Sequence, residues 1–450
     1  MKPKAIRGMN DVLPEASGTW RFVETIVREV IESYGYQEIR VPILEQTELF
    51  RRSIGEVTDI VEKEMYTFLD RNEESVTMRP EATAGMVRAG ISHGLFHNQR
   101  QKLWTAGPMF RYEKPQSGRY RQFHQIDVEA MGYAGPDVDA ELIIMSARMW
   151  QELGLSRLVL ELNSLGSLET RRKYRESLVN YFSAVKSKLD EDSIRRLEQN
   201  PLRILDSKNP DMQELIADAP IMLDYLDDES AQHFTELKVL LDAAGISYSV
   251  NPRLVRGLDY YNRTVFEWAT DALGSQGAIC AGGRYDGLVE KLGGRSTPAI
   301  GWAMGVERLV GLFEECGGKA PDAGPDVYIV AVGQAALVRG FEISENLREA
   351  IAGIRLELNL GGGSFKSQLK RADKSGAEFA LVLGDDEVAE NRAGLKPLRT
   401  DQDQASVALE HLAVELAGRL RRNEDSGLDH RSADQDPVST AKKQTGYTRA

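Results

Sequence analysis

A glycine- and proline-rich segment at residues 317–325 divides this chain into two parts with different hydrophobic patterns. It reads Gly-Gly-Lys-Ala-Pro-Asp-Ala-Gly-Pro, and such residues interrupt both helices and strands. After it, short apolar runs at 327–332 and 379–383 are separated by stretches with helical periodicity. Apolar strands that alternate with helices are typical of a small α/β domain whose sheet is mostly covered. We therefore predict one domain at 1–320 and a second, α/β domain at 326–420.

The part before the linker has strand-forming stretches that pair locally. Residues 20–34 have apolar side chains at helical spacing, and residues 35–42 predict a strand that stops at a proline. Residues 103–110 and 123–131 predict two longer strands, and the glycine- and proline-containing loop between them indicates an antiparallel pair. This pattern predicts an α+β fold built on an antiparallel sheet.

A helical and strongly charged block interrupts the strands of this predicted sheet. It spans about 168–245, between strand-like sequence at 157–162 and 246–250, and prolines break it into short helices. We predict that the block is a helical insertion. At the far end of the chain, residues 421–450 have mixed charges and almost no large apolar side chains, which predicts a disordered tail.

The composition is that of an ordinary soluble globular protein, with 42% hydrophobic and 28% charged residues. Cys280 and Cys316 are the only cysteines and lack the spacing of a zinc site, which favours a reducing, cytoplasmic location. No apolar run is long enough to span a bilayer, and the first residues lack the apolar core of a signal peptide. The net charge of −13 argues against nonspecific coating of nucleic acid, although local basic patches can still bind RNA.

Two short segments combine arginines with aromatic rings and acidic or amide side chains. The first runs from Phe110 to Gln125, and the second reads Arg-Gly-Leu-Asp-Tyr-Tyr at 256–261. Arginine binds phosphate or carboxylate through a planar, permanently charged fork, and Glu or Gln accepts hydrogen bonds from an ammonium group. Because a solvated charge run would not interleave its arginines with large rings, these segments predict a nucleotide site.

The first segment resembles a signature of the class II aminoacyl-tRNA synthetases. Phe-Arg-Tyr-Glu at 110–113 is similar to their second motif, and Gly-Trp-Ala-Met-Gly-Val-Glu-Arg at 301–308 to their third. Pro42, after its helix and strand, resembles the first motif, which lies at the dimer interface of that class. Each motif is weak alone, but three in the right order are specific.

Two further peptides narrow the resemblance to the histidyl-tRNA synthetases of the bacterial type. They are the segment at 256–261 and Gly-Gly-Arg-Tyr-Asp at 282–286, and the resemblance runs from about residue 6 to 420. It implies a class II catalytic domain and an anticodon-binding domain at 326–420. It also implies a cytoplasmic homodimer, a histidine–tRNA ligase that uses histidine, ATP with Mg²⁺ and histidine tRNA, with no membrane partner.

The resemblance also assigns roles to the residues that match the family's motifs. Arg111 would hold the ATP α-phosphate, Arg119 and Arg308 the γ-phosphate end, and Phe123 would stack on adenine. Arg256 would be the catalytic arginine between the substrate carboxylate and the α-phosphate, with Arg111 as the second catalytic group. The residues implied for histidine are Glu81, Thr83 and Gln125 around the ammonium, Glu129 and Tyr261 at the imidazole, and Arg256, Tyr260 and Tyr285 in the remaining pocket wall.

The chain departs from the family's pattern at two positions. Ala82 stands where a related sequence has Gly, and an alanine is tolerated there unless the backbone φ is positive. Lys114 stands where some bacterial relatives have Arg, which keeps a charge for the tRNA acceptor stem but loses bidentate base reading.

Several other features have a competing, purely structural interpretation. Lys366, Lys370 and Lys374 share one face of a predicted helix and form either a solvated surface or a tRNA contact. His93 and His97 have helical spacing but no third ligand, so no metal site is predicted. For the whole chain, the alternative function is a catalytically inactive relative that senses histidine or uncharged tRNA. The presence of Arg111, Arg256 and Arg308 together with the C-terminal domain argues against it.

Overall fold

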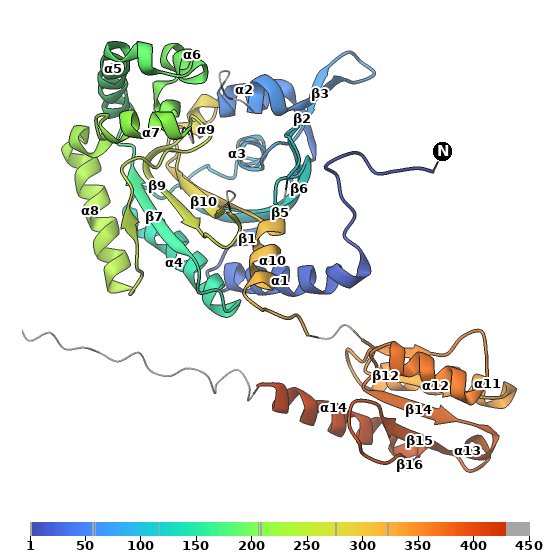
Figure 1. Ribbon diagram of the computed structural model, residues 1–450. Helices are drawn as coiled ribbons and strands as arrows, with labels where there is room; N and C mark the ends of the chain where they lie inside the picture. The colour runs from blue at the N-terminus through green and yellow to red at the C-terminus, as the bar shows by residue number, and fades with distance from the viewer. Residues whose placement is uncertain are drawn as a thin grey trace, which may run out of the picture. The chain divides into compact units, whose positions relative to one another are not determined.

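The computed structural model describes residues 2–55, 58, 60–116, 118–205, 207, 209–274, 277–321 and 324–428. The chain separates into two compact units, Met1–Pro321 and Asp322–Ala450 (Figure 1). Within the described residues, no helix is long and apolar enough to cross a membrane.

The first unit is built on an eight-stranded sheet with the order β1-β5-β6-β11-β10-β9-β7-β8. The strand pairs inside the sheet are all antiparallel, while the pairs β1–β5 and β7–β8 at its two edges are parallel. The predicted α+β fold on a largely antiparallel sheet is therefore confirmed. The strands are β1 (Gln37–Glu38), β5 (Gln101–Phe110), β6 (Gln122–Met131), β7 (Val159–Ser164), β8 (Ser249–Val250), β9 (Asn262–Ala269), β10 (Ala278–Arg284) and β11 (Ala299–Gly305).

The two faces of this sheet have different neighbours because successive strand side chains point to opposite sides. One face carries the apolar side chains of Trp104, Val128 and Trp302 and packs against helices. The helices on this face are α1 (Pro14–Ser33), α4 (Pro136–Glu152), α8 (Asp228–Ala243) and α10 (Val306–Glu315). The opposite face carries Leu103, Met109 and Met131 and contributes to a second core, which includes the tyrosines of the predicted pocket.

Two predicted strands are much shorter than expected. Of residues 35–42 only Gln37–Glu38 pair as β1, and of residues 246–250 only Ser249–Val250 pair as β8. Beyond β1 the chain turns away: the Ile39 amide still donates to the Trp104 carbonyl, but the Val41 carbonyl accepts from Arg79 instead of a strand. The first helix also begins earlier than expected, at Pro14, because a proline at the first helical position costs no hydrogen bond.

A small three-stranded sheet and three short helices also belong to the first unit. The sheet has the order β2-β4-β3 and is antiparallel throughout. Its strands are β2 (Leu44–Gln46), β3 (Tyr66–Leu69) and β4 (Ser75–Met78), and the helices are α2 (Thr47–Ile54), α3 (Thr83–Ser92) and α9 (Leu288–Lys291).

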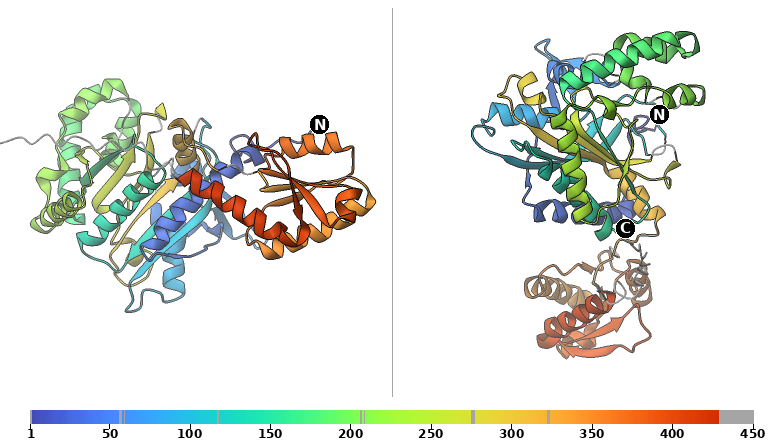
Figure 2. Two further views of the ribbon diagram at one scale, coloured as in Figure 1. Left: turned by 90° about the horizontal axis from the view of Figure 1, so that it is seen from below. Right: turned by 90° about the vertical axis from the view of Figure 1, so that its left-hand side faces the viewer.

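The predicted insertion is helical, and its longer helices begin at polar capping residues. Side chains of Ser167, Asp190, Asn209 and Asp227 each accept a hydrogen bond from a backbone amide at a helix start. The helices are α5 (Leu168–Ala184), α6 (Glu191–Gln199), α7 (Pro210–Ala217) and α8. Figure 1 and Figure 2 show α5, α6 and α7 gathered on the side of the unit away from α1, while α8 runs alongside α4.

The second unit has a five-stranded mixed sheet with the order β13-β12-β14-β15-β16. Apolar side chains of its central strands contact α11 and α14 on one face and α12 on the other, so the sheet is covered as predicted. The elements are β12 (Val327–Ala331), α11 (Gln334–Ala350), β13 (Leu356–Leu358), α12 (Phe365–Lys374), β14 (Phe379–Leu383), α13 (Asp385–Ala389), β15 (Arg392–Pro397), β16 (Ala405–Ala408) and α14 (Leu412–Leu428). Helix α14 thus continues into the predicted tail at 421–450, whose residues from 429 onward lie outside the described part of the chain.

Candidate active site

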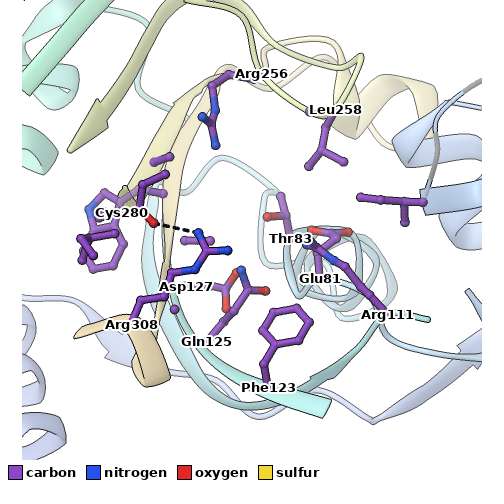
Figure 3. Close-up of a pocket in the computed structure, with 18 of the residues that line it drawn as sticks. Glu81, Thr83, Arg111, Phe123, Gln125, Asp127, Arg256, Leu258, Cys280 and Arg308 are labelled. Carbon is purple, nitrogen blue, oxygen red and sulfur yellow. Dashed lines mark hydrogen bonds between the residues drawn. The ribbon is translucent and has the colours of Figure 1, made fainter. Parts of the chain in front are cut away.

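A cavity of about 220 Å³ in the first unit collects the predicted ligand-binding residues (Figure 3). It lies over β6, β10 and β11, and the segment between β5 and β6, the start of α3 and the segment before β9 supply its other walls. All twelve residues predicted to bind ATP or histidine line it: Glu81, Thr83, Arg111, Arg119, Phe123, Gln125, Glu129, Arg256, Tyr260, Tyr261, Tyr285 and Arg308.

Strand β6 supplies one continuous row of these side chains. Phe123, Gln125, Asp127 and Glu129 alternate along the strand and therefore share its pocket face, while Ile126 and Val128 pack into the core behind it. Two residues along a strand span about 6.6 Å. The row therefore places a ring, an amide and two carboxylates one after another along the cavity, at a spacing that suits a long ligand such as an amino acid joined to a nucleotide.

Three guanidinium groups lie at the Phe123 end of the cavity. Arg111 Nε donates to the Pro80 carbonyl at 2.8 Å, and its guanidinium lies 5.2 Å from the centre of the Phe123 ring. Arg308 donates to the carbonyls of Gly118 at 2.9 Å and Ala278 at 2.8 Å. Arg119 forms an ion pair with Glu113.

These cations repel one another in the absence of an anion. Burial lowers the pKa of Arg308, and the positive charges of Arg119 and Arg111 lower it further. A bound polyanion would relieve this repulsion, and guanidinium groups can form paired hydrogen bonds with phosphate oxygens. The Phe123 end of the cavity is therefore suited to a triphosphate.

The other end of the cavity is built around the buried carboxylate of Glu129. Thr83 Oγ1 donates to Glu129 Oε1 at 2.6 Å, and the Tyr285 hydroxyl donates to Oε2. Burial raises the pKa of Glu129 well above its ordinary value, even though both hydrogen bonds favour the ionised form. Tyr261 is also buried, and its pKa is raised to about 12, so its hydroxyl keeps its proton and can donate or accept.

The start of α3 holds Glu81 in the same wall. Its Oε1 accepts from the Ala84 amide at 3.0 Å, and burial raises the pKa of the carboxyl group. Ala82 has a φ of −103°, which any residue adopts, so the methyl group that replaces the related glycine causes no backbone strain.

Arg256 lies on the segment before β9 and points into the cavity (Figure 3). It forms an ion pair with Glu267 of β9. The insertion supports this segment from behind: Arg171 Nη1 donates to the carbonyls of Asp259 at 3.1 Å and Tyr261 at 2.7 Å, and Asn200 donates to the Asp259 side chain at 2.9 Å.

A pair of polar side chains joins the two peptides that narrow the family resemblance. Asn262 Nδ2 donates to Asp286 Oδ2 at 2.9 Å, and the Asp286 amide donates back to Asn262 Oδ1 at 2.8 Å. The neighbouring Arg284 is fully buried and pairs with Asp139 of α4 and with Asp286. This network fixes Tyr261 and Tyr285, each one residue away from the pair, relative to each other.

Four carboxylates of the site had not been assigned a role from the sequence. Asp127 lines the cavity, Glu113 pairs with Arg119, Glu267 pairs with Arg256, and Glu307 accepts from the His124 amide at 2.9 Å. Only Asp127 had a local signal, because it alternates with Gln125 and Glu129 along one strand. The two partner carboxylates lack such a signal because their pairing depends on the folded chain.

The remaining candidates lie outside the cavity or carry no sign of reactivity. Among the described residues, no three His, Cys, Asp or Glu side chains cluster in a way that could hold a metal ion. His93 and His97 therefore belong to no such cluster. Cys280 is buried beside the cavity, and burial raises the pKa of its thiol well above the ordinary value, as expected for an inert thiol. In the second unit Lys366, Lys370 and Lys374 are all exposed on α12.

Comparison with known proteins identifies the family. A profile described as histidyl-tRNA synthetase matches residues 8–309, and a profile described as anticodon binding domain matches residues 326–419. A crystal structure of apo histidyl-tRNA synthetase from S. aureus is 38% identical, with a TM-score of 0.78 over 92% of this chain and 100% of that chain.

Two other solved structures share the fold at lower identity. The histidyl-tRNA synthetase from Nostoc sp. PCC 7120 is 21% identical, with a TM-score of 0.69 over 93% of this chain and 99% of that chain. An ATP phosphoribosyltransferase regulatory subunit/histidyl-tRNA synthetase from Bacillus halodurans C is 23% identical, with a TM-score of 0.61 over 82% and 97%. From the matched profiles and the similarity to the S. aureus structure, we conclude that the chain belongs to the histidyl-tRNA synthetase family.

Proposed function

We propose that the cavity over β6 is where this chain, a histidine–tRNA ligase by its family, joins histidine to ATP. The observation that supports this most directly is the convergence of all twelve predicted ligand-binding residues on one cavity. In the first step a carboxylate oxygen of histidine attacks the α-phosphorus of ATP, and pyrophosphate leaves. In the second step the 3′-hydroxyl of the tRNA attacks the carbonyl carbon of the adenylate, AMP leaves, and the hydroxyl proton is released.

In this proposal the phosphate end works by positioning and charge. Arg111 binds the α-phosphate, Arg119 and Arg308 bind the γ-phosphate end, and Phe123 stacks on adenine. Negative charge grows at the α-phosphorus in the transition state, so Arg256 stabilises the transition state more than the bound substrates. In this first step no side chain needs to take up a proton, because the attacking carboxylate is already ionised.

At the other end Glu129 and Tyr261 hold the two imidazole nitrogens. Glu129 is itself held by Thr83 and Tyr285, so its carboxylate is fixed before histidine arrives. An analogue that lacks either ring nitrogen would leave one of these buried polar groups without a partner. A site of this kind can select against such an analogue by about 10⁴-fold.

Magnesium would arrive with the nucleotide. The described residues contain no carboxylate cluster for a resident ion, and Glu113 and Glu307 near the arginines are engaged by Arg119 and His124. Mg²⁺ prefers phosphate oxygens and water with one or two carboxylates, so this donor set fits an ion held mainly by ATP. Such an ion would supply charge neutralisation at the phosphates.

The second unit would bind the anticodon part of histidine tRNA, and the chain would act as a cytoplasmic homodimer. The matched anticodon-binding profile and the exposed lysines of α12 support the tRNA role. Sedimentation of the purified protein tests the dimer, and a mass of one chain would contradict it.

One assay separates the ligase from the inactive regulator. We expect the purified protein to exchange labelled pyrophosphate into ATP only when histidine is present. Well-folded protein that binds histidine but shows no exchange would favour the regulator instead.

A further inference from the structure

Asp127 lies at the centre of the pocket row of β6, between Gln125 and Glu129. Its side chain is fully buried and lines the cavity (Figure 3). Among the described residues, neither of its carboxylate oxygens has a hydrogen-bond partner. Burying a carboxylate without hydrogen bonds is costly, so this residue does not contribute to folding in the way that most buried acids do.

The nearby arginines do not satisfy Asp127. Arg79 and Arg111 act on it only electrostatically. Arg79 directs its hydrogen bonds to the carbonyls of Pro108 at 2.9 Å and Val41 at 3.0 Å, and Arg111 Nε is bonded to the Pro80 carbonyl. Asp127 is therefore not explained as one half of a structural ion pair.

Two other buried acceptors in the same cavity also lack partners. They are Glu81 Oε2 and Gln125 Oε1, which line the cavity together with Asp127. Thr83, the other residue implied for the ammonium, already donates its hydroxyl proton to Glu129. The cavity thus presents three side chains with unsatisfied acceptor oxygens, one from the start of α3 and two from β6, and an ammonium group has three N–H donors.

We propose that Asp127 is a binding residue for the α-ammonium of histidine, which it holds together with Glu81 and Gln125. This inference rests on the proposed function, because it assumes that the cavity takes histidine. It adds to that function a second negative charge for the ammonium. The charge would favour amino acids over otherwise identical acids that lack the amino group.

The protonation of Asp127 gives the inference a second observable. Burial, and then the negative charge of Glu81, raise the pKa of Asp127 to about 8, while Arg79 and Arg111 lower it. The carboxyl group is therefore mostly protonated in the free protein at pH 7. An ammonium group favours the ionised form, so binding histidine at pH 7 releases a proton from Asp127. Glu81 and Glu129 also have raised pKa values, so the release must be assigned by comparison with a variant.

The test compares wild type with Asp127→Asn in binding three ligands by calorimetry. Histidine and histidinol carry the ammonium group, whereas imidazolepropionate keeps the imidazole and carboxylate without it. Hydrogen bonds to charged groups contribute about 1.5–3 kcal/mol, so D127N should bind histidine and histidinol about 10- to 100-fold more weakly. Its affinity for imidazolepropionate should stay within about threefold of wild type, because that ligand makes no contact with Asp127.

Two further measurements distinguish ligand binding from a structural role. D127N should unfold at the same temperature as wild type or higher, since it removes an unpaired buried acid. Proton release on histidine binding at pH 7, measured in buffers of different ionisation enthalpy, should be smaller for D127N. Equal weakening for all three ligands, unchanged histidine affinity, or a lowered unfolding temperature would each overturn the inference. Histidine-dependent pyrophosphate exchange by wild type tests the proposed function separately.

Discussion

Replacing Gly301 with alanine would place a methyl group inside the part of the cavity that we propose for histidine. Gly301 of β11 lies opposite Glu129 of β6, and the Glu129 side chain folds over it. A Cβ atom at Gly301 would lie 1.6 Å from Glu129 Oε2 and 2.5 Å from the Val128 carbonyl oxygen. Real Cβ atoms essentially never approach a heavy atom closer than 3.0 Å, so the carboxylate would have to retreat by more than an ångström.

The size of the effect follows from the bonds that this retreat breaks. The retreat would carry the Glu129 carboxylate away from the imidazole that we propose it binds, and a hydrogen bond to a charged group contributes about 1.5–3 kcal/mol. We therefore expect G301A to lower kcat/KM for histidine by about 10- to 100-fold in pyrophosphate exchange, as much as Glu129→Ala. The KM for ATP should change little, because the arginines lie at the other end of the cavity.

A matched control is available in the adjoining helix. Gly311 of α10 would meet nothing within 4 Å if it carried a Cβ. Gly311→Ala should keep full activity and gain about 0.5–1 kcal/mol of stability, because glycine is unfavourable inside a helix. If G301A used histidine as well as wild type, the placement of Glu129 over Gly301 and its role at the imidazole would both be wrong.

Four other changes give distinct outcomes. Arg256→Ala should cut adenylation by about 10²–10³, mainly in kcat, with partial rescue by lysine, and a change in the KM for histidine alone would make it a binding residue. Glu129→Ala should weaken histidine use by about 10- to 100-fold without affecting ATP, whereas equal losses for both substrates would contradict its assignment. A chain that ends at Pro321 should still form adenylate but charge tRNA poorly, and full charging would refute the tRNA role of the second unit. Arg171 does not line the cavity, but Arg171→Met should still lower the rate of adenylation because it removes the hydrogen bonds to the carbonyls of Asp259 and Tyr261. Unchanged kinetics would show that this support is dispensable.

The sequence predicted the elements whose signals are local. The apolar, strand-like sequence at residues 123–131 predicted β6. The charged, helical pattern of the insertion predicted its helices, and α5 and α8 begin at the polar capping residues Ser167 and Asp227. The strand predicted at 35–42 depended instead on whether a neighbour was available. After Glu38 the backbone carbonyl of Val41 is taken by Arg79, an interaction that no local pattern reveals.

The candidate site shows the same division. The twelve cavity-lining residues could be predicted because each matches a position to which the family assigns a role. The ion pairs of Glu113 with Arg119 and of Glu267 with Arg256 could not, since they depend on how the folded chain brings these side chains together. Asp127 lay within the matched strand, but a resemblance transfers only the roles that the family already has, and its missing hydrogen bonds become visible only in three dimensions.

The row of ligand groups on β6 has a consequence for how this enzyme can change. The groups that we propose for adenine, the ammonium and the imidazole occupy every second position along one strand. Inserting or deleting a single residue within 123–129 would turn every later group away from the cavity and push core residues into it. Evolution can therefore exchange the side chains of this strand one at a time, but it cannot alter the strand's length between Phe123 and Glu129. Relatives with new amino-acid preferences should differ here by substitution and never by a gap.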